Sequence, residues 1–341
     1  MQRLLMALLV VAGCAPRVLP PPVAPPQVAA RPARVDTTSA DVRAILGRAR
    51  DMASDSRRGR GPWTAENESV ARHLADELEQ MGARPVFDGQ LLVPFIVESR
   101  PRDTVYNVIG VLPSLSGSTT GDLIGITAHF DHLGVGKRDA SGDSIYNGFL
   151  DAALPVSMVL DVAARYSRHR GEHPLLIMFF NLEEQGLLGS NAIVARGDAT
   201  PVIERLRLLI GVDAGSPAGE AIEWQLMGAQ PEHAGGRLAD SLARARGWTT
   251  TATAPRPISD VFPFSQRGVP IIFPIPGKVW RGYTEQQRAD AMSRFDHYHQ
   301  PSDEWRADFP SVGTVHFANW LWDIVRVASS GGGLRRGSQP Q

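Results

Sequence analysis

Short apolar runs alternate with amphipathic segments along the middle of the chain, and this alternation is typical of an α/β protein. The clearest apolar runs are Leu123–Thr127, Leu175–Phe180 and Leu206–Val212. Each is short, bounded by polar turn residues and apolar at nearly every position, which indicates a strand buried on both faces of a parallel sheet. We therefore predict an α/β fold with a doubly wound, mixed but mostly parallel sheet and helices on both faces.

The remaining elements follow from the same patterns. Further strands are expected at Thr104–Leu112, Ile222–Met227 and Val269–Pro274. Apolar residues at helical spacing predict helices at Ser39–Ala53, Ala65–Met81, Pro155–Arg165, Gly186–Val194, Ala234–Arg246, Thr284–Phe295 and Phe317–Val327. Between the first two helices, the arginines Arg57, Arg58 and Arg60 are interpreted as a solvated loop.

Charged side chains follow three of the predicted strands. His129 and Asp131 follow the first, Glu183 and Glu184 follow the second, and Asp213 follows the third. Ligand sites in α/β sheets lie at the carboxyl ends of the strands, so these side chains are expected to converge. Histidines and carboxylates gathered at one edge suggest a metal site.

Two further residues, Asp151 and His132, are candidates for the same site. Asp151 precedes a predicted helix, where an acid is either a helix cap or a ligand. His129 and Asp131 are two positions apart and would point the same way on a strand, which suits a ligand histidine oriented by a carboxylate. His132 is an alternative ligand, although strand alternation would turn its side chain to the other face.

The amino terminus is typical of an exported protein. Residues 1–13 combine Arg3 with the apolar run Leu4–Val11, as in a signal peptide. The run Val11-Ala12-Gly13-Cys14 resembles the bacterial lipoprotein box, which implies lipidation of Cys14; an ordinary signal peptide with an incidental cysteine is the alternative. By the same resemblance, Ala15 favours the outer membrane. We expect a protein exported to the cell envelope and anchored there through lipid, facing the periplasm.

Composition limits the domain count and the partners. The prediction is a proline-rich tether at 14–38, a single α/β domain at 39–328 and a disordered tail at 329–341. The chain has 341 residues, of which 43% are hydrophobic, and this suffices for one large core. A formal net charge of -1 provides no field that would attract nucleic acid, so no nucleic-acid partner is expected.

Five segments together resemble the co-catalytic zinc aminopeptidases of metallopeptidase family 28. They are AHFDHLG, GDSIYNG with the following Asp151, NLEEQGLLGS, Asp213 and YHQPSDEW. The resemblance extends from about Asp55 to Ala328. It implies a phosphorylase/hydrolase-like zinc exopeptidase fold with two zinc ions at the strand ends, for which cobalt or manganese are possible substitutes. The implied activity removes the amino-terminal residue of a peptide substrate with a metal-bridging hydroxide.

The resemblance also implies a role for each matched residue. The implied ligands are Asp151, which bridges both metals, Glu184 and His299 at one site, and His129 and Asp213 at the other. Asp131 would orient His129, and Glu183 would be the general base. The chain departs from the family at Leu150, where an acid is usual, and at Val261, where a histidine is common.

The residues of the substrate pocket are less defined by the sequence. Asp260 is a candidate, as are Trp280 and Tyr283 within Gly277–Asp296, a segment expected to rim the pocket rather than to be a surface insertion. Two other functions remain open. The Asp-x-Ala-x-Pro pattern at Asp151 is similar to the glutaminyl cyclases, relatives that use a single zinc ion, and a catalytically silent lipoprotein that binds peptides would keep the same fold.

Overall fold

The computed structural model describes residues 40–213, 218–230, 232–331 and 334. The predicted signal peptide, Cys14 and tether lie outside the described residues, as does most of the predicted tail. Within the described part of the chain, no helix has the length and apolar character needed to cross a membrane.

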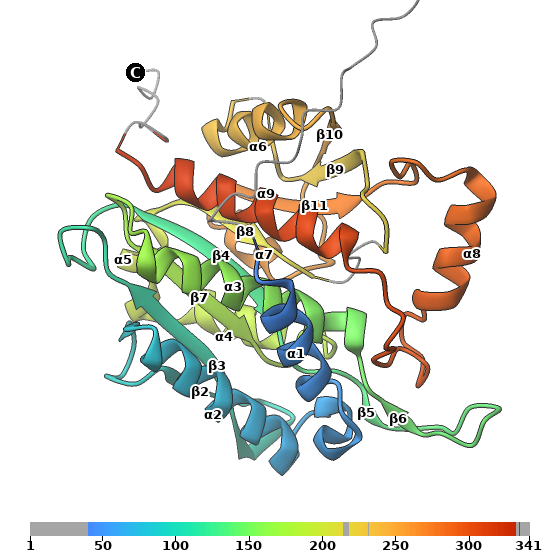
Figure 1. The fold of residues 1–341 in the computed structure, drawn as a ribbon. Helices are drawn as coiled ribbons and strands as arrows, with labels where there is room; N and C mark the ends of the chain where they lie inside the picture. Colours follow the sequence, from blue (N-terminus) through green and yellow to red (C-terminus); the bar gives the residue numbers. More distant parts are fainter. Residues whose placement is uncertain (1–39, 214–217, 231, 332–333, 335–341) are drawn as a thin grey trace, which may run out of the picture. The chain divides into compact units, whose positions relative to one another are not determined.

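A nine-stranded mixed sheet lies at the centre of the domain, in the order β1-β3-β7-β4-β8-β11-β9-β10, with β2 paired to β3 (Figure 1). Its strands are β1 (Arg84–Pro85), β2 (Leu92–Val97), β3 (Arg100–Leu112), β4 (Leu123–His129), β7 (Leu175–Phe180), β8 (Leu206–Gly211), β9 (Glu223–Met227), β10 (Thr249–Thr253) and β11 (Ile271–Pro276). The central strands β7, β4, β8 and β11 are parallel. On either side of them, β3 and β9 pair antiparallel to their neighbours. A separate two-stranded sheet pairs β5 (Gly134–Val135) with β6 (Ile145–Tyr146).

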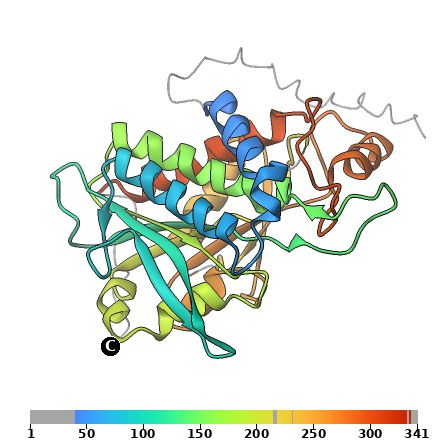
Figure 2. The same cartoon turned by 90° about the horizontal axis from the view of Figure 1, so that it is seen from below.

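Helices cover both faces of the sheet, as predicted (Figures 1 and 2). One face carries α1 (Val42–Met52), α2 (Ala65–Gln80), α3 (Leu154–Arg168), α6 (Ala234–Arg244) and α9 (Val312–Ala328). The other carries α4 (Leu188–Ala195), α5 (Thr200–Ile203) and α7 (Val261–Ser265). Helix α8 (Glu285–Phe295) projects to the side of the sheet, and none of its residues is buried.

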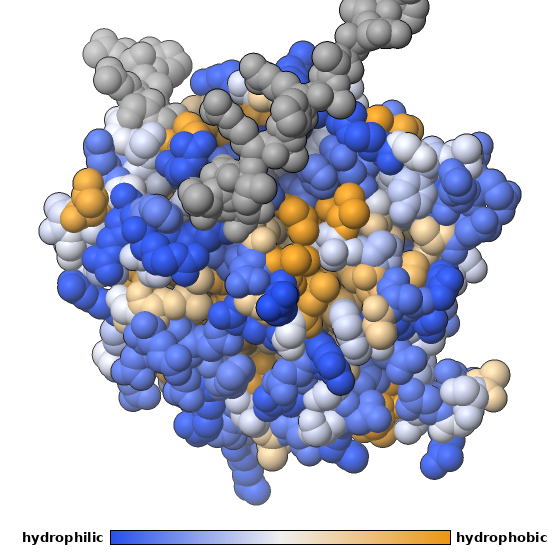
Figure 3. Space-filling view, in the orientation of Figure 1, coloured by the Kyte–Doolittle hydropathy of each residue, from blue (hydrophilic) through white to orange (hydrophobic). Residues whose placement is uncertain are grey.

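The uninterrupted apolar runs of β4 and β7 are explained by this double cover. Every residue of both strands is buried. Successive side chains enter opposite cores: Ile124 and Ile126 pack under α3, whereas Leu123 belongs to the core beneath α5 and α7. Most of the apolar residues in the described part of the chain are buried. The face drawn in Figure 3 is largely hydrophilic, with apolar residues gathered near its centre.

The outer strands β1, β2 and β10 were not predicted from the sequence. The residues of β10 are all threonine or alanine and none is buried, so the strand has no apolar alternation to recognise. β3 was predicted to begin at Thr104 but begins at Arg100, because its exposed first residues pair with β2 in a hairpin. Strands β2 and β10 are held in the sheet mainly by main-chain pairing and have few buried side chains.

Candidate metal centre

The three charged strand ends lie at one edge of the sheet. β4 ends at His129, β7 is followed by a turn that carries Glu183 and Glu184, and β8 is followed within two residues by Asp213. Because β7, β4 and β8 are adjacent and parallel, their carboxyl ends meet. The convergence expected from the sequence is therefore found.

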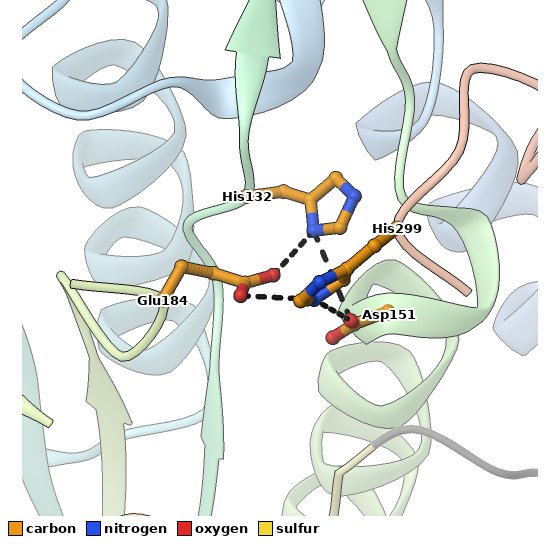
Figure 4. A group of neighbouring side chains, drawn as sticks. All are labelled: His132, Asp151, Glu184 and His299. Atoms are coloured by element: carbon orange, nitrogen blue, oxygen red, sulfur yellow. Dashed lines mark hydrogen bonds and ion pairs between the residues drawn. The ribbon is translucent and has the colours of Figure 1, made fainter. Parts of the chain in front are cut away.

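Two groups of side chains at this edge have the residue types and spacing of a metal site. Within each group the ligand atoms lie within 4.8 Å of one another. The first group consists of His129, Asp151 and Asp213, and the second of His132, Asp151, Glu184 and His299. Figure 4 shows the four side chains of the second group pointing toward one another. Asp151 is the one residue common to both groups.

The two carboxylate oxygens of Asp151 face different groups. Its Oδ1 lies 3.1 Å from His129 Nε2, which is also 3.0 Å from Asp213 Oδ1. Its Oδ2 lies 3.2 Å from His299 Nε2, which is also 3.0 Å from Glu184 Oε2. This is the arrangement expected of a carboxylate that bridges two cations.

His132 belongs to the second group, contrary to the expectation that it would face away. Its Nδ1 lies 2.7 Å from Glu184 Oε1 and 4.0 Å from Asp151 Oδ2. The expectation was wrong because β4 ends at His129, so the strand alternation on which it depended does not reach His132. The H-x-D-H spacing was visible in the sequence, but the path of the chain after the strand was not.

Asp131 contacts His129 and the turn that carries Glu183 and Glu184. Its Oδ1 lies 3.7 Å from His129 Nδ1, and its main-chain oxygen lies 3.2 Å from the same nitrogen. The carboxylate of Asp131 also accepts hydrogen bonds from the N–H groups of Glu183, at 3.1 Å, and Glu184, at 3.3 Å. Asp131 thus lies where the sequence analysis expected an orienting group, and it also fixes the glutamate turn, which the sequence did not reveal.

Burial and charge shift the protonation of the carboxylates. Burial raises the pKa of Glu183 to about 10, and the nearby Asp213, Asp260 and Asp131 add to the rise while His129 opposes it. Burial also acts to raise the pKa of Asp151, but hydrogen bonds with two histidines lower it well below the usual range of an aspartate. The centre therefore concentrates negative charge that a bound cation would stabilise.

The donor set fits zinc. Imidazole nitrogens together with carboxylate oxygens suit zinc, with cobalt and manganese as chemically close substitutes. His299 Nε2 is buried and faces carboxylate oxygens of Asp151 and Glu184, at 3.2 Å and 3.0 Å, so it lies among the other candidate ligand atoms. In His132 the nitrogen that faces Glu184 is Nδ1, whereas the buried Nε2 has no hydrogen-bond partner within the described residues.

Leu150, next to Asp151 in the chain, forms part of the wall of a cavity of about 420 Å³. Most of the lining is apolar and includes Trp280, with Met292 and Phe295 contributed by α8. The chain therefore has an apolar side chain at position 150, where the family that it resembles usually has an acid.

The other two candidate pocket residues, Tyr283 and Asp260, do not line this cavity. Tyr283 packs edge-on against Trp280, with ring centroids 5.5 Å apart, and is not among the residues that line this cavity. Asp260 is also absent from its lining and is buried, with its pKa raised to about 7 by burial and by the neighbouring Asp131 and Asp213.

Comparison with known proteins agrees with this geometry. The model of Peptidase family M28 matches residues 107–322. Comparison with curated protein sequences finds no match. Among solved structures, a zinc aminopeptidase from Bacillus subtilis has a TM-score of 0.62 and 14% identity, over 86% of this chain and 96% of the other. The LapA aminopeptidase of Legionella pneumophila has a TM-score of 0.60 and 17% identity, over 85% and 72%. A glutaminyl cyclase from an Acidobacteriales bacterium has a TM-score of 0.62 and 13% identity, over 89% and 99%.

Proposed function

Because the chain belongs to peptidase family M28, we propose that it is an aminopeptidase that uses two zinc ions to hydrolyse the amino-terminal peptide bond. The observation that carries this proposal is the position of Asp151, whose two oxygens face separate groups that each contain a histidine and a second acid. One group would hold one ion and the second group the other. Bound zinc supplies a Lewis acid for the scissile carbonyl and lowers the pKa of water to about 7.

Glu183 is proposed as the general base. It belongs to neither ligand group, and its main chain is fixed by Asp131. Its carboxylate would take a proton from the attacking water and pass it to the leaving amine. Burial is the largest cause of its raised pKa, and the nearby acids Asp213, Asp260 and Asp131 raise it further. Cations among these acids would lower that pKa and leave Glu183 ionised as a base requires.

The test compares two reactions and the metal content. We expect the purified chain to contain close to two zinc ions and to release the amino acid from an aminoacyl chromogen. A chelator should abolish the release and zinc should restore it. A single tightly bound ion, together with cyclisation of a glutaminyl peptide, would instead support a glutaminyl cyclase, the activity named for one of the similar structures. Peptide binding without either reaction would indicate a catalytically silent peptide-binding protein.

The cavity beside Asp151 is proposed to receive the side chain of the substrate's amino-terminal residue. Its apolar walls favour an apolar side chain, because apolar contacts replace water there. Met292→Trp fills part of the cavity and should lower kcat/KM for leucyl and phenylalanyl substrates about tenfold or more relative to an alanyl substrate. Ser293→Trp is the matched control, since Ser293 is exposed on the same helix. Equal preference profiles for the two variants would contradict this assignment.

A further inference from the structure

Arg60 is fully buried beneath the metal centre, so its interpretation as part of a solvated loop was wrong. It ends the short 3₁₀ turn Asp55–Arg60. Among the residues that the structure describes, its guanidinium donates only to main-chain carbonyls, those of Met52 at 2.9 Å, Phe130 at 2.8 Å, Asn147 at 2.6 Å, Gly148 at 2.9 Å and Asp151 at 3.4 Å. These oxygens come from the end of α1, from the segment after β4 and from the segment before α3, so one side chain joins all three.

Asp303 holds the segment before α3 by accepting hydrogen bonds from the main-chain N–H groups of that segment. It is 1% exposed, and its carboxylate accepts hydrogen bonds from the N–H of Leu150 at 3.0 Å and of Asp151 at 3.2 Å. Its main-chain oxygen accepts the N–H of Phe149 at 3.0 Å. Asp303 lies four residues after His299, so the loop that supplies a ligand histidine also supports the neighbouring ligand segment.

The main chain of Asp151 is therefore held between the guanidinium of Arg60 at its carbonyl oxygen and the carboxyl group of Asp303 at its amide nitrogen. Fixing both peptide groups fixes the direction of the side chain that leaves the Cα between them. We propose that Arg60 and Asp303 are positioning residues, a buried pair that aims the carboxylate of Asp151 at two metal ions at once. This inference rests on the proposed metal centre, and it assigns the pair no contact with substrate.

The main chain of Arg60 also contacts His132, a histidine of the second group. The carbonyl of Arg60 accepts the N–H of His132 at 3.3 Å and the side-chain amide of Asn67 at 3.0 Å. Asn67 in turn exchanges hydrogen bonds with Asn181, at the start of the turn that carries Glu183 and Glu184. The pair thus belongs to a buried network that extends under the whole centre.

A guanidinium suits this position because no other side chain offers five N–H donors in one plane. Burial lowers the pKa of Arg60 to about 10, although nearby carboxylates such as Asp151 and Asp303 oppose this, and the group stays charged at neutral pH. The charge itself repels a bound dication. Electrostatics alone therefore predicts that removal of Arg60 strengthens metal binding and that removal of Asp303 weakens it, whereas positioning predicts that both removals weaken it.

The test measures Co²⁺ binding to the full chain by competition with a chelating dye, together with the visible absorption spectrum of the bound ion. Arg60→Met and Asp303→Asn should each weaken Co²⁺ binding about 10- to 100-fold, as loss of groups that support ligands does. Each should also change the shape of the spectrum, because the ligands are displaced. Arg58→Met and Asp308→Asn are the matched controls at exposed sites and should match the unmodified chain.

The outcomes separate this inference from the proposed function. Folded Arg60→Met with unchanged or tighter Co²⁺ binding overturns the positioning role while the metal centre stands. If circular dichroism shows that Arg60→Met does not fold, Asp303→Asn decides: an altered spectrum supports the role, and an unaltered one overturns it. An unmodified chain that binds no Co²⁺ contradicts both the metal centre and the role of the pair.

Discussion

Glu183→Gln should lower turnover about 100- to 10,000-fold, the usual contribution of a positioned acid–base group, while leaving the metal content and the fold unchanged. Glutamine keeps the volume of Glu183 but cannot take up the proton of the attacking water. The N–H that Asp131 holds is a main-chain group and is retained in the variant. Turnover of an aminoacyl chromogen and elemental analysis of the same sample provide the two measurements.

Glu184→Ala is the contrasting variant for this prediction. Glu184 belongs to the second group, where its oxygens lie 2.7 Å from a nitrogen of His132 and 3.0 Å from one of His299. Its loss should first reduce metal occupancy and lower activity as a consequence, so excess zinc should restore part of the activity. Excess zinc should restore none for Glu183→Gln. The opposite pattern would mean that the roles of the two glutamates are reversed.

Asp151→Asn should remove metal from both sites and reduce activity to that of the metal-free protein. Asp151 is the member common to both groups, and an amide offers a single neutral oxygen in place of two charged ones. Asp213→Asn alters the first group alone, so it should lose about one ion and keep the other. Zinc content measured by elemental analysis distinguishes the two variants.

Circular dichroism provides the control for the Asp151 prediction. The main-chain contacts of Asp151 with Arg60 and Asp303 do not involve its side chain and persist in Asp151→Asn. The variant should therefore fold. Folded Asp151→Asn that retains two ions would show that Asp151 does not bridge, and the arrangement of the centre would have to be revised.

The sequence by itself determined the sheet centre and where its chemistry lies. Strands β4, β7 and β8 are buried on both faces, so their apolar runs are local signals that need no knowledge of the fold. Their charged ends indicated one edge of the sheet, because parallel neighbours place their carboxyl ends together. All five predicted ligands meet there, and their roles remain predictions.

Only the tertiary structure decided which other side chains enter or support the centre. His132 faces Glu184 because the chain leaves strand geometry after His129. The sequence suggests a surface arginine at Arg60, yet five carbonyl oxygens from three separate segments, two of them far away in sequence, satisfy its buried guanidinium. Asp303 likewise binds main-chain groups far away in sequence, such as the N–H of Leu150. Main-chain oxygens and N–H groups are alike at every residue, so no sequence pattern shows which of them will surround a side chain.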